Sequence, residues 1–160
     1  NNDTNALVVS GGEPLLQQEE LIVLFEKLKK LGWWIEVETN GTIVPQDTFL
    51  ELVDQINCSP KLTNNVQDSE ERRIVFSSLR KLSLCGKTSF KFVVSGKTDV
   101  WEIKKLVSDY EMKEVYLMPE GRTRKEQAEK YEEVLGLSLS LGFLFSTRLH
   151  VLFWDNKRGV

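Results

Sequence analysis

The fold of this chain is decided near its start, by the stretch ALVVSGGEPLLQQEEL at residues 6–21. A short apolar run ends there at two glycines, a glutamate and a proline, and a helical pattern of apolar residues begins directly afterwards. Gly11 and Gly12 let the backbone approach another group closely or adopt a positive φ. Pro14 suits the first turn of a helix, where its missing N–H costs nothing. The stretch therefore predicts a strand that turns at once into a helix.

The same alternation continues along the rest of the chain. Strands are expected at residues 6–10, 34–39, 55–59, 88–95 and 114–119, and residues 143–154 are expected to be extended or a final strand. Helical patterns separate them, including one at 69–84 and one at 97–110 that Thr98 or Asp99 would cap. Such alternation is typical of parallel α/β organisation, and both an open sheet and a β/α barrel are compatible with it.

Length and composition set the general class of the protein. With 160 residues, 41% of them hydrophobic and 28% charged, we expect a single globular domain over 1–160. A net charge of −3 gives no general reason to bind nucleic acid, and no apolar run reaches the roughly 18 residues of a membrane helix. Two cysteines cannot make a disulfide framework, so a reducing compartment and a cytoplasmic location are expected. The chain lacks an initial Met and soon enters a buried-type strand, so we expect a piece of a longer protein.

The carboxyl ends of the expected strands are rich in polar residues and glycine. They read SGGEP, ETNGT, NCSPKL, VVSGKT and LMPEGR. Because sites in parallel α/β folds form at these ends, the pattern predicts a binding face. Neither of the common phosphate-loop motifs is present. The first loop instead offers bare backbone groups and one carboxylate, which suit a cationic amine better than a phosphate.

Two acidic residues lie on one side of the expected strand WIEVET. Glu36 and Glu38 alternate with apolar residues, so both carboxylates are expected to face away from the helices and to find partners there. Lys61 and Lys91 are the candidate partners. Glu38, at the end of the strand, is the favoured site residue.

No residue in the sequence is assigned as a catalytic base or nucleophile. His150 is the only histidine, and in an apolar strand it is expected to be a packed side chain. Cys58 is expected to be a small buried residue rather than a nucleophile.

Six segments, in order, carry a resemblance to a known family: SGGEPLLQ, VETNGT, NCSPKL, KFVV, YLMPEGRTR and RLHVLFWDNKRGV. Together they resemble the 7-carboxy-7-deazaguanine synthase family of radical S-adenosylmethionine (SAM) enzymes. GGEP alone is also shared with the activating enzymes of glycyl-radical proteins, which is one alternative. A non-catalytic α/β module that keeps a SAM-binding pocket is another.

The resemblance implies an incomplete parallel β/α barrel of about five to six strands. It also implies a ring contraction of 6-carboxy-5,6,7,8-tetrahydropterin with SAM, a four-iron–four-sulfur cluster and magnesium, and a possible homodimer. The SAM site expected from the strand ends and the resemblance comprises Gly11, Gly12, Glu13, Glu38, Ser59, Pro60, Lys61, Met118, Pro119, Glu120 and Gly121. The substrate contacts that the resemblance implies are Ser10 and Val160.

One element of the family pattern is absent from the sequence. Relatives hold the cluster with a C-x-x-x-C-x-x-C loop that precedes GGEP, and a magnesium-binding threonine lies in the same region. Cys58 and Cys85 are too few to supply three thiolates. We therefore expect an enzyme as the parent protein and no cluster, metal site or turnover from these 160 residues alone.

Overall fold

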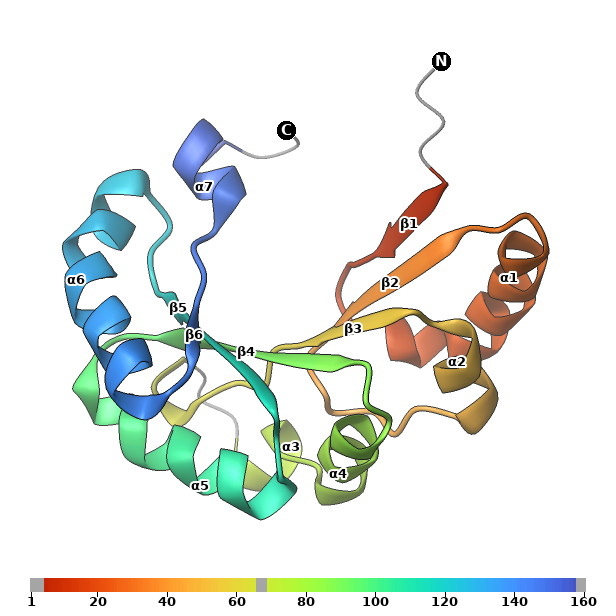
Figure 1. The fold of residues 1–160 in the computed structure, drawn as a ribbon, viewed down its shortest axis with the longest axis horizontal. Coiled ribbons are helices and arrows are strands. Elements are labelled where there is room, and N and C mark those ends of the chain that lie inside the picture. Colours follow the sequence, from red (N-terminus) through yellow and green to blue (C-terminus); the bar gives the residue numbers. More distant parts are fainter. Residues whose placement is uncertain (1–4, 66–68, 158–160) are drawn as a thin grey trace. The chain divides into compact units, whose positions relative to one another are not determined.

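The computed structural model describes residues 5–65 and 69–157 (Figure 1). Its strands are β1 (Ala6–Val9), β2 (Trp34–Thr39), β3 (Gln55–Cys58), β4 (Thr88–Val94), β5 (Glu114–Pro119) and β6 (Leu144–Phe145). Its α-helices are α1 (Gln18–Lys30), α2 (Asp47–Leu52), α3 (Glu70–Arg73), α4 (Phe76–Leu84), α5 (Val100–Tyr110), α6 (Arg124–Leu141) and α7 (Leu149–Trp154). Short 3-10 turns are η1 (Pro14–Gln17), η2 (Thr63–Asn65) and η3 (Lys97–Asp99). Within the described ranges, no helix is long and apolar enough to cross a membrane.

The strands form one sheet in the order β1-β2-β3-β4-β5-β6, so each strand lies beside the next one in the sequence. β1 pairs in parallel with β2, β2 with β3, and β5 with β6. Parallel neighbours need a crossover connection, and the helices supply it. The expected α/β fold with five to six parallel strands is confirmed.

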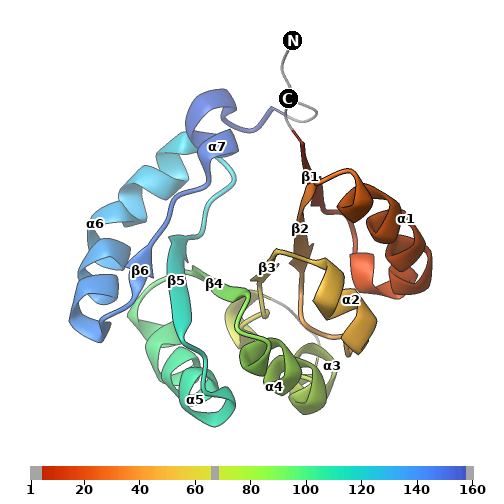
Figure 2. The same ribbon diagram turned by 45° about the vertical axis from the view of Figure 1, so that its right-hand side comes forward.

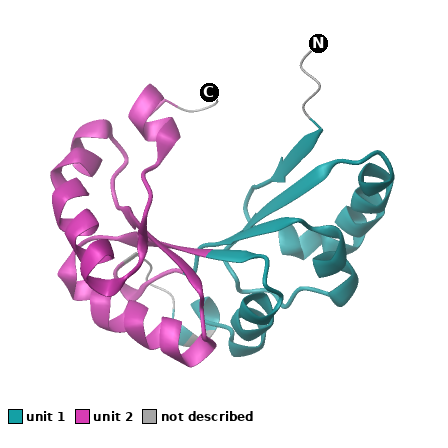
Figure 3. Cartoon of the chain, in the orientation of Figure 1, with its two compact units in different colours: residues 1–60, 68–89 teal, residues 61–67, 90–160 magenta. Residues whose placement is uncertain are grey.

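The chain divides into two compact units (Figure 3). Unit 1 comprises residues 1–60 and 68–89, and unit 2 comprises residues 61–67 and 90–160. The single domain expected from the length stays a prediction.

Unit 1 has an apolar core on one face of its sheet. Ile35 and Val37 of β2 are fully buried, whereas the intervening glutamates lie on the opposite face, as the period of two requires. Phe25 of α1 and Phe49 of α2 are also buried, with ring centroids 5.6 Å apart. The helices therefore cover the apolar face and leave the polar face for other roles.

A carboxylate joins α1 to the sheet of unit 1. Asp54 accepts hydrogen bonds from Lys29 Nζ at 2.8 Å and from the Ile35 N–H at 2.7 Å. Burial raises the pKa of Asp54, but these two hydrogen bonds and the lysine charge more than offset it, so the pKa is lowered.

The core of unit 2 is built from β4, β5 and the helices beside them. Phe92, Leu117, Ile103 and Val134 are fully buried. Helix α6 begins with a capping box, in which Thr123 and Glu126 each accept from the other's backbone N–H.

Two expected elements differ from the structure. Residues 69–84 form α3 and α4 rather than one helix, because the β-branched Ile74 and Val75 between them are extended. The segment 143–154 is extended only at β6 and then forms α7, in which Val151 is buried.

The expected cap of the helix at 97–110 is also corrected. Asp99 occupies the cap position of α5, but its side chain makes no capping hydrogen bond. Its carboxylate accepts instead from the Ser95 N–H at 2.7 Å and from the Asn64 amide at 2.5 Å.

Candidate functional site

The carboxylate of the SGGEP turn shapes the turn itself. Glu13 Oε1 accepts from the Leu15 N–H at 3.1 Å, which caps η1, and from the Thr39 hydroxyl at 2.8 Å. Its other oxygen, Oε2, accepts from the Asn40 N–H at 2.8 Å. Glu13 therefore joins the end of β1 to the end of β2. These hydrogen bonds explain why this strand-to-helix turn contains an acidic residue.

The two glycines leave the outer side of the turn bare. Gly11 has a φ of 147°, a conformation that favours glycine. Both glycines are exposed, and a Cβ at either would meet nothing within 4 Å. Their backbone groups are therefore accessible to a ligand, while Glu13 fixes their position.

The polar face of β2 carries two pairs of side chains. The Ser10 hydroxyl donates to Glu38 Oε2 at 3.0 Å, and the Asn57 amide donates to Glu36 Oε1. Both glutamates lie on the face expected for them. Within unit 1 their partners are a serine and an asparagine, and the expectation that Lys61 or Lys91 of unit 2 also partners them stays a prediction.

The end of β3 lies beside the end of β2. The Ser59 N–H donates to the Thr39 carbonyl at 2.8 Å, which continues the parallel ladder and leads directly to Pro60. Gly41, with a φ of 78°, packs so closely here that a Cβ would lie 2.8 Å from Cys58 Sγ. Unit 1 thus brings three strand ends together, with the site residues Ser10, Gly11, Gly12, Glu13, Glu38, Ser59 and Pro60.

In unit 2, Glu120 links the ends of β4 and β5. Its Oε2 accepts from Lys130 Nζ at 2.9 Å and from the Ser95 hydroxyl at 2.8 Å. These hydrogen bonds, that of Lys130 first, lower the pKa of Glu120. The Glu120 N–H also donates to the Val94 carbonyl at 2.9 Å. The carboxylate is therefore anchored, and it carries its charge near neutral pH.

A polar network that includes the buried Asp99 lies beside Glu120, and sequence reasoning missed it as part of the site. Asn64 donates to the Ser95 hydroxyl at 3.0 Å and to Asp99, which is only 4% exposed. Lys61 is exposed, at the start of the segment that this network holds. The serine of VVSGKT, Ser95, was the signal available in the sequence, because it directly follows a strand of a parallel sheet.

Gly121 ends the segment 118–121 in a position that only glycine fits. Its φ is 155°, and a Cβ would lie 2.8 Å from the backbone nitrogen of Gln127. Its carbonyl accepts from the Gln127 amide at 3.2 Å and from Arg148 Nη1 at 3.3 Å. Met118 is half-buried and Pro119 is buried beside it.

The remaining candidates are placed as follows. Cys58 is fully buried, which confirms the burial expected for it. His150 is exposed on α7, so the expectation of a packed side chain in a strand is wrong. Val160 lies outside the described residues. In the part of the chain that the structure describes, no group of three His, Cys, Asp or Glu side chains could hold a metal ion.

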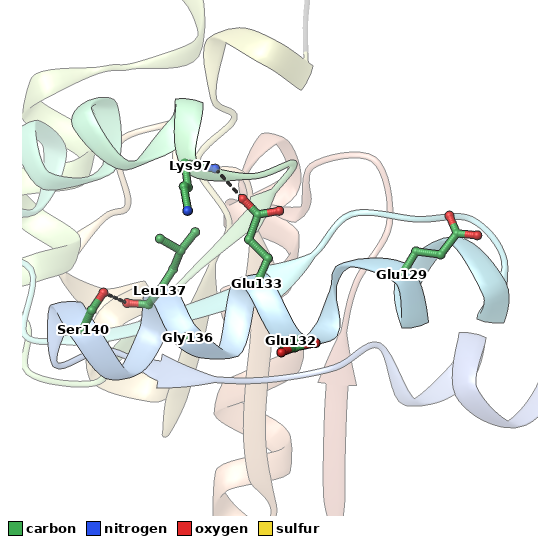
Figure 4. A pocket seen from close by; sticks show the side chains of 7 residues that line it. All are labelled: Lys97, Glu129, Glu132, Glu133, Gly136, Leu137 and Ser140. Atoms are coloured by element: carbon green, nitrogen blue, oxygen red, sulfur yellow. Dashed lines mark hydrogen bonds between the residues drawn. The ribbon is translucent and has the colours of Figure 1, made fainter.

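A hollow of about 560 Å³ lies along α6 in unit 2 (Figure 4). Acidic residues line much of it, and Glu133 Oε1 accepts from the Lys97 N–H at 3.2 Å. It contains none of the expected site residues. We therefore place the candidate site at the strand ends.

Comparisons with known proteins agree with this placement of the chain among α/β folds. No family model matches the sequence. A 7-carboxy-7-deazaguanine synthase of Halobacterium salinarum is 33% identical over 94% of this chain and 65% of its own length. The Pyrobaculum aerophilum enzyme is 35% identical over 96% of this chain and 67% of its own length. The chain thus spans about two thirds of the length of these relatives.

Solved structures share the fold at low sequence identity. A domain of pyruvate-formate lyase-activating enzyme from Bacteroides vulgatus has a TM-score of 0.61 at 12% identity, covering 89% of this chain and 98% of that one. Streptococcus suis SuiB bound to S-adenosylmethionine has a TM-score of 0.58 at 13% identity, covering 89% of this chain and 38% of that one. The sequence identity to the two synthases, over nearly the whole of this chain, establishes the family as well as the fold. The chain belongs to the 7-carboxy-7-deazaguanine synthase family of radical SAM enzymes.

Proposed function

We propose that this chain carries SAM-binding strand ends of an enzyme that converts 6-carboxy-5,6,7,8-tetrahydropterin to 7-carboxy-7-deazaguanine. The observation that supports this most is the SGGEP turn, with two bare glycines held in place by Glu13. Membership of the family supports SAM as the ligand for this turn. SuiB, which shares the fold, is known with SAM bound.

The proposal gives the residues the following roles. Gly11 and Gly12 offer backbone groups to the amino-acid end of SAM, and the nearby Glu13 charge favours the ammonium group. Ser10 contacts substrate, and its partner Glu38 belongs to the same polar face. The other proposed SAM contacts are Ser59, Pro60, Lys61 and residues 118–121, and the proposed substrate contact at the far end of the chain is Val160.

The residues of this chain do not fit an iron–sulfur cluster. Cys58 is fully buried at the end of β3, and Cys85 follows α4 with its thiol against the Leu82 carbonyl at 3.0 Å. A four-iron cluster needs thiolates that converge on one point. We therefore propose that these 160 residues alone bind no cluster and do not cleave SAM, and we derive no step through the cluster or through magnesium.

SAM binding tests the proposal directly. The φ of Gly12 lies outside the left-handed region and the space over it is open, so Gly12→Val should fold while its side chain fills the space of the ligand. Calorimetric titration should show SAM affinity for the unaltered chain and a loss of at least about tenfold in the variant. Gly136→Val, at another glycine with open space, is the matched control. Equal affinity in the Gly12 variant would refute the assignment of this turn.

Anaerobic reconstitution with iron and sulfide tests the second part of the proposal. We expect no stoichiometric cluster and no 5′-deoxyadenosine from SAM under reductant. A cluster near one per chain, with turnover, would contradict it.

The pterin substrate, a homodimeric state and a cytoplasmic location are further parts of the proposal. Titration of the pterin into the chain in the presence of SAM, and sedimentation of the purified chain, check the first two. The likeness to pyruvate-formate lyase-activating enzyme, at 12% identity, is one of fold and does not favour an activating enzyme.

A further inference from the structure

Helix α7 is fastened at both ends to the loop between β5 and α6. At its start, Arg148 Nη1 donates to the Gly121 carbonyl at 3.3 Å. At its end, Asp155 Oδ1 accepts from the Arg124 N–H at 2.8 Å. Arg124 Nη2 also donates to the Phe153 carbonyl at 3.4 Å. Figures 1 and 2 both show α7 beside the start of α6.

Few apolar contacts hold α7 in this position. Val151 is its one buried residue, at 4% exposure, whereas Leu149 and Phe153 are 61% and 65% exposed. Burial of one valine side chain removes only a small apolar area from water, so its contribution to docking is limited. The polar contacts to the β5–α6 loop are therefore a large share of what docks the helix.

The backbone at Asp155 is strained in the docked position. Its φ of 56° and ψ of −134° lie in a region that non-glycine residues rarely adopt. Such a conformation persists where other contacts compensate for it. The hydrogen bond from the Arg124 N–H is the contact that its side chain makes here.

The segment 118–121 is held from the side of α6 as well. Gln127 is fully buried, and its amide donates to the Gly121 carbonyl while Oε1 accepts from the Thr147 hydroxyl at 3.3 Å. Thr147 immediately precedes Arg148. The carbonyl of Gly121 thus receives hydrogen bonds from α6 and from the segment that leads into α7.

We infer that Arg148 and Asp155 are positioning residues, which fix the backbone of the β5–α6 loop through α7. In this arrangement the docked helix and the ordered loop stabilise one another. If docking of α7 raises the affinity of the loop for a ligand by some factor, binding of that ligand raises the equilibrium constant for docking by the same factor, because coupling is reciprocal. The consequence for SAM affinity rests on the proposed function, in which residues 118–121 contact SAM.

The test compares two substitutions at one position by amide hydrogen exchange and SAM titration. Asp155→Gly removes the acceptor and relaxes the positive φ, whereas Asp155→Asn keeps an acceptor oxygen and tolerates the same backbone. In the glycine variant, exchange at residues 120–124 and 149–155 should quicken about tenfold, and SAM affinity should fall. In the asparagine variant both should stay within about twofold of the unaltered chain. Asp109→Ala, which removes a half-exposed carboxylate paired with Lys105, is the control.

The outcomes separate this inference from the proposed function. Faster amide exchange at 120–124 in Asp155→Gly, with a return to the original exchange rate in Asp155→Asn, supports the positioning role. If the unaltered chain also binds no SAM, the proposed function fails and the positioning role still stands. Unchanged exchange at 120–124 in the glycine variant overturns the inference. If the unaltered chain binds SAM, a glycine variant in which α7 exchanges faster but SAM affinity stays the same also overturns the inference.

Discussion

Replacing Glu13 by alanine should destabilise unit 1 strongly although the residue lies in a surface turn. The change removes three hydrogen bonds to a carboxylate, from Leu15, Thr39 and Asn40. The capping bond is worth about 1 kcal/mol. Each hydrogen bond to a charged group is worth about 1.5–3 kcal/mol, with the lower end appropriate to a half-buried carboxylate. We expect the free energy of unfolding to fall by about 3–5 kcal/mol, a large share of the 5–15 kcal/mol typical of a domain.

Urea unfolding followed by circular dichroism measures this change, with two comparison variants. Glu13→Gln keeps one acceptor oxygen but sets an amide NH₂ against a donor, so a loss of about 1–3 kcal/mol is expected. Glu26→Ala, at an exposed position on α1, should change stability by less than about 0.5 kcal/mol. If Glu13→Ala costs no more than the Glu26 control, Glu13 does not hold the turn and the account of the site loses its basis.

Two further predictions concern unit 1. Gly41→Ala should lower the free energy of unfolding in urea by about 1–3 kcal/mol, because alanine would have to keep the positive φ and its Cβ would lie 2.8 Å from Cys58 Sγ. A neutral effect would contradict the close packing. The pKa of Asp54 is lower in the folded chain, so its contribution is present above the ordinary value of 3.8 and is lost as the pH falls through the lowered one. Asp54→Asn should therefore weaken the acid-side decline of the unfolding free energy that the Lys29 pair causes, and an unchanged decline in urea unfolding at low pH would contradict this role.

The strands as far as β5 could be predicted because each is an apolar run bounded by polar turn residues. A parallel sheet covered by helices produces this local pattern directly. The polar face of β2 was predictable for the same reason, since Glu36 and Glu38 share one parity. Their partners were not, because Ser10 and Asn57 become neighbours only through the register of β1, β2 and β3.

The apolar pattern of the sequence did not predict the secondary structure at the end of the chain. The run FLFSTRLHVLFW has the apolar density of a strand, yet residues 149–154 are helical because distant contacts to Gly121 and Arg124 hold them. The role of Glu13 was hidden in the same way. Its position in the motif indicated a ligand contact, whereas its observed partners are backbone and hydroxyl groups brought close by the fold.

The order of the strands has a consequence for how the chain acquires its structure during synthesis. Ala6 pairs opposite Trp34, Glu36 opposite Gln55 and Tyr116 opposite Leu144, so each pairing closes a loop of only one strand–helix segment. Such closures lose less chain entropy than pairings between distant parts of the chain would. Each new strand can therefore add to a preformed neighbour as it leaves the ribosome, without waiting for a distant part of the chain. Ribosome-bound chains halted after β3 should already protect β1 and β2 from proteolysis.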